Sequence, residues 1–155
     1  MDLLPLTLAL PILAYVAASD LRRMRIPNRA SWAMLLLYAL SLPLIGLPAA
    51  GAQLLAAVTV FALGLALFML RILAGGDVKF LAALMLVIPA GTWTIFAFVF
   101  SVAMLVAILG ITGLRQVPVM RGIGWVLMRS RGTLPMGVAM ALAGAGHLAL
   151  LARFA

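Results

Sequence analysis

Residues 92–114 read TWTIFAFVFSVAMLVAILGITGL, an apolar run without a charged side chain. A helix needs about 20 residues to cross the hydrocarbon of a bilayer, so this run can span a membrane. Backbone amides in hydrocarbon find no water, and the run lacks the two-residue alternation of barrel strands, so we expect a helix. Similar runs recur near 3–19, 31–47, 52–73, 78–89 and 133–152. The sequence therefore predicts an all-α, polytopic membrane protein with about six transmembrane helices in a single domain, residues 1–155.

The composition excludes several classes of function. Of the 155 residues, 67% are hydrophobic and only 9% are charged, whereas soluble domains carry about 25% charged residues. No basic residue precedes the first apolar run, so we expect a retained span and not a cleaved signal peptide. The absence of cysteine excludes disulfides, thiolate metal sites and a thiol nucleophile. The net charge of +8 is scattered between apolar runs, so we expect no nucleic-acid partner.

The basic residues predict the orientation. Ten of the eleven lie in or beside the first, third and fifth connections, near 20–30, 71–79 and 115–132, and only Arg153 lies opposite. Cytoplasmic connections of membrane proteins are enriched in Lys and Arg, so both termini are expected on the exterior side. Residues 115–132 could form either an amphipathic surface helix or a solvated loop. The three tryptophans are expected to be interfacial anchors, and they are Trp32, Trp93 and Trp125.

The acidic residues are the candidates for chemistry, because the chain has only three. Asp2 lies at the exterior terminus, whereas Asp20 closes the first predicted helix and Asp77 opens the fourth. The predicted topology places these two carboxylates at similar depth on the cytoplasmic side. Two neighbouring carboxylates do not both ionise easily, so one keeps a proton while the other is charged. Such a pair can activate water and polarise a peptide carbonyl without a metal or cofactor.

We expect Asp20 to hold the proton, because a helix C-terminus disfavours negative charge, and Asp77 to be the base at the start of the fourth helix. Serine–histidine chemistry is not expected, because the single histidine, His147, lies towards the exterior side. We interpret His147 as a packed or hydrogen-bonded residue of the last helix.

The segments around both aspartates are unusual. Gly75 and Gly76 precede Asp77, and consecutive glycines allow a turn with positive φ and close approach of another chain. Asp20 is followed by a basic stretch and Ile26-Pro27-Asn28. Here Pro27 should end any continuing helix, and Asn28 can cap the next one.

At these residues the chain resembles the type IV leader (prepilin) peptidase family, and in particular its short members that serve Flp/Tad-type pili. In that family the first aspartate is followed by a basic stretch and Ile-Pro-Asn, and the second lies in Gly-x-Gly-Asp-Val-Lys. This chain has both elements, except that Ala74 takes the place of the first glycine. A late Pro-x-Gly element matches Pro135-Met136-Gly137. The combination of three spaced elements is more specific than any one of them.

The resemblance implies a peptidase of the bacterial inner membrane that needs no cofactor. Its catalytic residues would be Asp20 and Asp77. The substrate would be a prepilin whose short basic leader stays in the cytoplasm and is cut off just after a glycine. The Cys-x-x-Cys elements that the resemblance links to N-methylation are absent, so we expect cleavage without methylation. The remaining motif residues, which would position the substrate, are Pro27, Asn28, Gly75, Gly76, Lys79, Pro135 and Gly137.

Two other classes of function are consistent with part of the sequence. A small transporter or channel could use the aspartates as ion or proton sites and would show flux without proteolysis, but internal repeats and mid-span charges are lacking. A non-catalytic assembly subunit could pack through small residues such as Gly137 and Gly144. Replacing either aspartate with asparagine would then leave function intact.

Overall fold

The computed structural model describes residues 3–116 and 135–154, and all regular structure in these residues is helical. The predicted all-α class is confirmed, and the helix ends differ from the predicted ones by at most five residues. Four helices, α1, α3, α5 and α8, are long and apolar enough to cross a membrane, which fits a polytopic membrane protein. The helices are α1 (Leu4–Arg23), α2 (Asn28–Ile45), α3 (Leu47–Met69), α4 (Gly75–Met85), α5 (Trp93–Leu114) and α8 (Met136–Phe154).

Helix α4 is shorter than the predicted run 78–89. Its 11 residues rise only about 16 Å, roughly half of the hydrocarbon thickness. Turn hydrogen bonds from Leu86 and Val87 end the helix before the proline at position 89. The side chains of Phe80 and Leu84 are fully buried, because α2, α3 and α8 all contact this helix. Helix α4 is therefore an enclosed half-span.

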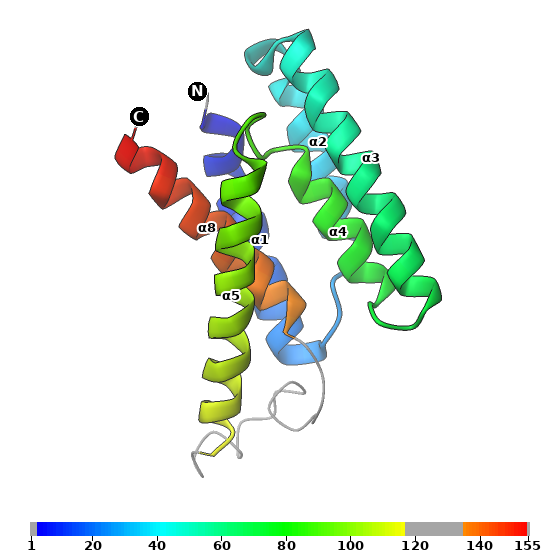
Figure 1. Cartoon of the computed structure of the whole chain (residues 1–155), viewed down its shortest axis with the longest axis vertical. Coiled ribbons are helices and arrows are strands. Elements are labelled where there is room, and N and C mark those ends of the chain that lie inside the picture. Colours follow the sequence, from blue (N-terminus) through cyan, green and yellow to red (C-terminus); the bar gives the residue numbers. More distant parts are fainter. Residues whose placement is uncertain (1–2, 117–134, 155) are drawn as a thin grey trace.

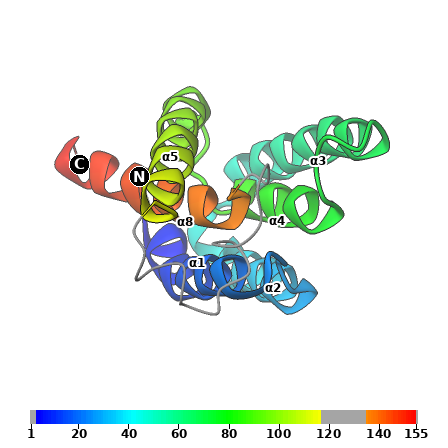
Figure 2. The same cartoon turned by 90° about the horizontal axis from the view of Figure 1, so that it is seen from below.

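The described helices form two groups of three (Figures 1 and 2). Helix α8 packs on α1 and α5, and α4 packs on α2 and α3. The groups meet where α1 contacts α2 and where α4 contacts α8. The two chain ends lie at the same end of the molecule (Figure 1), and α1 ends and α4 begins at the opposite end. We call these assemblies the α1/α5/α8 group and the α2/α3/α4 group.

Small residues let helices approach closely within each group. A Cβ atom on Gly144 would lie 2.5 Å from Leu13 Cδ1, and one on Gly64 would lie 2.7 Å from Val78 Cγ1. Without a hydrophobic driving force in lipid, helices associate through close packing at such positions. Gly144 thus supports the contact of α8 with α1, and Gly64 supports the contact of α3 with α4.

The connection from α1 to α2 carries the chain between the groups. Helix α1 ends because Met24 adopts a left-handed conformation (φ 52°) and donates its N–H to the carbonyl of Asp20. Arg22 and Arg23 therefore lie in the last turn of α1, not in a loop as the sequence suggested. Pro27, in an extended conformation, is the N-cap of α2. The expected capping by Asn28 was wrong, because Asn28 is already helical and no side chain caps α2.

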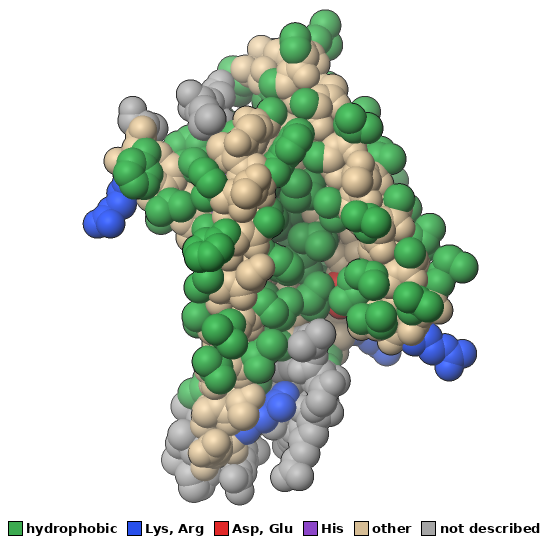
Figure 3. Space-filling view, in the orientation of Figure 1, with side chains coloured by type: hydrophobic (Ala, Val, Ile, Leu, Met, Phe, Trp, Pro, Cys, Tyr) green, Lys and Arg blue, Asp and Glu red, His purple; other side chains and the backbone are tan. Residues whose placement is uncertain are grey.

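The surface suits a lipid environment. Large apolar side chains such as Leu36, Leu63 and Phe98 are exposed on α2, α3 and α5. In Figure 3 the visible basic side chains gather at the lower end, except near the C-terminal end of α8, which carries Arg153. This distribution agrees with the charge asymmetry of the sequence. Asp2, Trp125 and most of segment 115–132, with Arg121, Arg129 and Arg131, lie outside the described residues.

Candidate active site

Asp20 lies in the last turn of α1 and is only 6% exposed. Its Oδ2 accepts hydrogen bonds from two backbone amides at the start of α8, those of Gly137 (2.9 Å) and Val138 (3.3 Å). The first N–H groups of a helix have no partner within the helix, and the helix dipole favours a negative charge there. The start of α8 therefore stabilises Asp20 in its ionised form.

Gly137 allows this contact because it has no side chain. A Cβ atom at this position would lie 2.7 Å from the Cβ and 2.9 Å from the Cγ of Asp20. Pro135, two residues earlier, is buried, and its carbonyl accepts the N–H of Ala139. The Pro-x-Gly element thus starts α8 and brings its free amides against Asp20.

Asp77 lies in the first turn of α4, where its backbone N–H bonds the carbonyl of Ala74. The two preceding glycines do not use the positive φ that glycine allows, because both are helical and neither has a positive φ. Gly76 instead permits a close approach, since a Cβ on it would lie 3.2 Å from the backbone oxygen of Ile26. Ala74 is the N-cap with φ −81° and ψ 146°, an extended conformation open to any L-residue. Alanine in place of the family glycine therefore causes no strain.

The two carboxylates line one cavity of about 460 Å³ between the α1/α5/α8 group and the α2/α3/α4 group. Asp20 comes from the first group and Asp77 from the second. On the face shown in Figure 3, the visible acidic surface lies in the lower part of the recess between the groups. The other lining residues are Met24, Arg25, Ile26, Asn28, Ile72, Leu73, Ala74, Gly76 and Met136.

The surroundings give the two carboxyl groups different properties. The pKa of Asp77 is raised from 3.8 to about 6, mainly by burial and in addition by the negative charge of Asp20, while hydrogen bonding to the backbone of Ala74 partly offsets both effects. Asp20 has the two amide donors of α8. These surroundings favour the reverse of the predicted division, because they make Asp77 the more readily protonated member of the pair and Asp20 the more readily ionised one. The predicted protonation of Asp20 was based on the C-terminus of α1 alone. The N-terminus of α8 lies against the same carboxylate and has the opposite effect.

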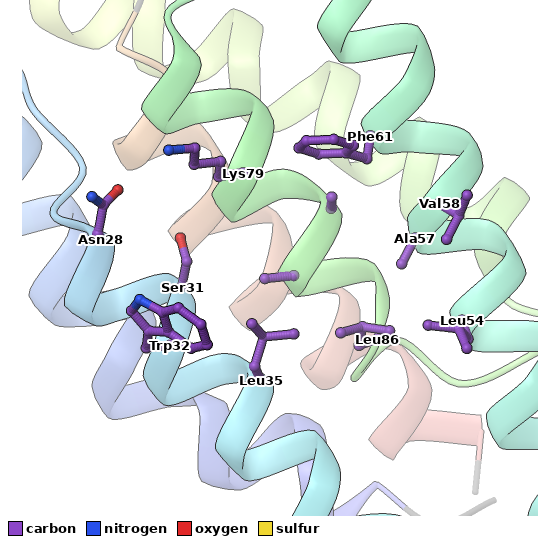
Figure 4. A pocket seen from close by; sticks show the side chains of 12 residues that line it. Asn28, Ser31, Trp32, Leu35, Leu54, Ala57, Val58, Phe61, Lys79 and Leu86 are labelled. Carbon is purple, nitrogen blue, oxygen red and sulfur yellow. The ribbon is translucent and has the colours of Figure 1, made fainter.

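The remaining predicted residues lie in different places. Asn28 and Gly76 line the cavity, whereas Lys79 does not and lines a groove beside α4 (Figure 4). Gly75 is the first residue of α4 and Pro27 is the N-cap of α2. Neither residue lines the cavity. His147 is fully buried, lies 2.9 Å from the hydroxyl of Thr92 and contacts the ring of Phe96 edge-on, which confirms its interpretation as a packed, hydrogen-bonded residue.

Two kinds of site residue were not predicted from the sequence. Val138 acts through its backbone amide, so its side chain carries no signal. Met136 lines the cavity, and its place between Pro135 and Gly137 in the Pro-x-Gly element could have indicated it. Met24 and Arg25 line the cavity because the left-handed Met24 turns the chain at the end of α1.

Fold and site together define a polytopic helical membrane protein that encloses a pair of carboxylates at one end of its helices. In the described residues no cluster of three or more His, Cys, Asp or Glu could hold a metal ion. The family model described as the type IV leader peptidase family matches residues 7–111, a range that includes both aspartates. The chain belongs to this family, which supports a type IV leader peptidase function with a prepilin as substrate. No curated protein and no solved structure matches the chain.

Proposed function

We propose that this protein is an aspartic endopeptidase that removes the short basic leader from type IV or Flp-type prepilins at the cytoplasmic face of the inner membrane. One observation carries the proposal. Asp20 and Asp77, 57 positions apart in the chain, line the same cavity. Buried carboxylates are costly in a membrane protein and indicate function there.

The unequal surroundings of the pair assign a role to each carboxyl group. Ionised Asp20 takes a proton from a water molecule in the cavity, and the resulting hydroxide oxygen attacks the scissile carbonyl carbon. Protonated Asp77 donates a hydrogen bond to the carbonyl oxygen and stabilises the charge that develops on it. When the tetrahedral intermediate collapses, the proton that Asp20 took passes to the leaving amine. None of these reaction steps uses a metal or a cofactor.

The position of the cavity supports cleavage beside a membrane-embedded helix. Both aspartates lie at the end of the molecule where Arg22, Arg23 and Arg25 are found, and such residues favour the cytoplasmic side. A prepilin helix held in the bilayer would bring its cytoplasmic end to the depth of the cavity. The motif resemblance is the support for a substrate of the Flp type.

Co-expression with a tagged candidate prepilin tests the proposal. Leader removal is followed by gel shift for the wild type and for the Asp20→Asn and Asp77→Asn variants. Both variants should lose at least about 100-fold in cleavage rate, because each removes one member of the pair. Asp2→Asn is the matched control, since it makes the same change at the third acid of the chain. Near wild-type processing by either site variant would end the aspartic mechanism.

Two further measurements show whether a variant has lost its chemistry or its fold: the amount of protein in the membrane and the binding of unprocessed prepilin. Both Asn variants should accumulate in the membrane and co-purify with unprocessed prepilin, because Asn preserves the side-chain volume. A variant that cuts normally but changes ion flux through reconstituted vesicles would instead favour the transporter class.

A further inference from the structure

A second hollow lies beside α4, apart from the cavity that holds the carboxylates. It is an open groove of about 510 Å³, with α2 and α3 as its sides and α4 as its floor. Figure 4 shows Asn28, Ser31 and Lys79 at one end of the groove and Leu54 and Leu86 at the other. The groove therefore has a polar end and an apolar end.

The polar end is made of hydrogen-bond donors. Lys79 carries a positive charge, Asn28 has an amide and Ser31 a hydroxyl. None of these three side chains has a hydrogen bond or ion pair anywhere in the described structure, and no acidic residue lines the groove. One cation flanked by neutral donors matches a singly charged oxyanion such as the phosphate of a phosphodiester.

The apolar end matches hydrocarbon. Its floor is formed by Ala82 and Ala83 of α4, with Ala57 of α3 at the side, and all three small residues are buried. Its rim carries Leu54 and Val58, which are more than half exposed. In a membrane-spanning protein such a surface contacts lipid chains, because no water reaches it.

The groove runs along α4. Between Lys79 and Leu86, α4 rises about 10 Å, so a phosphate held at Lys79 would place the first part of an attached acyl chain beside Leu86.

We propose that this groove binds one phospholipid of net negative charge, with its phosphate at Asn28, Ser31 and Lys79 and one acyl chain along α4 towards Leu54 and Leu86. The charge of Lys79 matches that of one phosphate group. A zwitterionic lipid also brings a cation, which Lys79 repels, so the site selects anionic lipid. The bound phosphate would bridge the first turn of α2 and the second turn of α4.

Trp32 provides a probe, because it lines the groove and its side chain is 71% exposed. The chain has three tryptophans, so Trp93→Phe with Trp125→Phe leaves Trp32 as the only one. This Trp32-only protein is reconstituted in phosphatidylcholine that contains a small fraction of a lipid with brominated acyl chains. The brominated lipid is either phosphatidylglycerol or phosphatidylcholine. Brominated phosphatidylglycerol should quench the fluorescence of Trp32 at a mole fraction several-fold lower than brominated phosphatidylcholine.

Matched variants identify the site. Lys79→Ala should abolish the difference between the two brominated lipids, and Lys79→Arg should keep it. Arg71→Asn removes another exposed cation that does not line the groove and should have no effect; Asn tolerates the positive φ of position 71. Val58→Phe, which narrows the groove, should weaken quenching by both lipids.

Two results would overturn the proposal. One is equal quenching by both brominated lipids in the Trp32-only protein. The other is a Lys79→Ala variant that elutes as a folded species in gel filtration and still prefers brominated phosphatidylglycerol as strongly as the parent protein. If a prepilin helix peptide relieved quenching while both lipids quenched alike, the groove would be a site for the substrate helix. These readouts report lipid contact and not cleavage, so they are independent of the peptidase proposal.

Discussion

Gly137 is where α8 meets Asp20, and it is the site residue most sensitive to an added methyl group. In Gly137→Ala the new Cβ, 2.7 Å from Asp20 Cβ, would push the start of α8 away and weaken both amide hydrogen bonds. Hydrogen bonds to charged groups contribute about 1.5–3 kcal/mol, so prepilin cleavage should fall by roughly 10- to 100-fold. Gly110→Ala in α5, where a Cβ meets nothing within 4 Å, should cleave like the wild type. Equal rates for the two variants would show that the close approach is unimportant.

Ala74 gives a prediction of the opposite kind. Its extended conformation does not require glycine, so Ala74→Gly, which restores the family pattern, should leave the cleavage rate within about twofold of the wild type. A large gain in rate would mean that alanine distorts the turn before Asp77. Initial rates at saturating prepilin are the measurement.

The carboxyl group of Asp77 predicts a pH dependence of stability. Its pKa rises from 3.8 to about 6 on folding, so the folded state binds the proton more tightly than the unfolded state. The associated stability is fully present below pH ~4 and is lost as the pH rises through about 6. The full shift corresponds to about 3 kcal/mol, and solvent access to the cavity reduces this to about 1–2 kcal/mol. Asp77→Asn should remove this loss in denaturation by detergent between pH 4 and 7, and an unchanged pH profile would contradict the assignment.

At the residue scale the sequence was sufficient to find the pair but not to divide its roles. Asp20 and Asp77 were identified because the chain has only three acids and charge is rare in membrane helices. The surroundings of Asp20 include the amide of Val138, 118 residues away in the chain, which donates a hydrogen bond to its carboxylate. Propensity and local spacing contain no information about such a long-range contact.

Among the elements, α4 differs most from what its composition suggested. The apolar run 78–89 predicted a span, but the helix has 11 residues and is enclosed by its neighbours. Hydropathy cannot distinguish an apolar segment that faces lipid from one buried in protein, since both are apolar all round. The long helices were predicted within a few residues, because length and composition alone decide whether a helix can span a bilayer.

The packing of α3 on α4 can be tested at Gly64. A Cβ there would lie 2.7 Å from Val78 Cγ1, so Gly64→Ala should destabilise the protein by about 1–3 kcal/mol and lower cleavage by displacing the neighbouring Asp77. Adding Val78→Ala should restore part of both losses by making room. Gly51→Ala, also in α3 but in open space, is the control. Additive losses in the double variant would contradict a direct contact.

For the whole molecule, the sequence predicted one domain and an orientation but not the division into two helix groups. Which helices pack together depends on small residues such as Gly144 facing Leu13, and this pairing is not visible in any single helix. The charge asymmetry, by contrast, depends only on counting basic residues along the chain. An orientation can therefore be predicted by counting, and it stays a prediction, whereas the tertiary packing could not be predicted at all.

Thiol labelling can test the orientation, because the native chain has no cysteine. Leu47→Cys and Leu70→Cys lie at the two ends of α3 and replace highly exposed side chains. With both termini exterior, a membrane-impermeant maleimide should label Leu47→Cys in intact cells and Leu70→Cys only after permeabilisation. The reverse pattern would place the carboxylates at the exterior face.

The cavity brings together one acid from each of the two helix groups, which contact each other through α1 and α2 and through α4 and α8. Each group carries one of the two carboxyl groups, so in the proposed mechanism neither group alone could hydrolyse a peptide. A compound that wedged the groups apart by a few ångströms would silence the enzyme without touching either acid. Such a wedge would compete neither with water nor with the scissile bond, and raising the concentration of precursor would not overcome it.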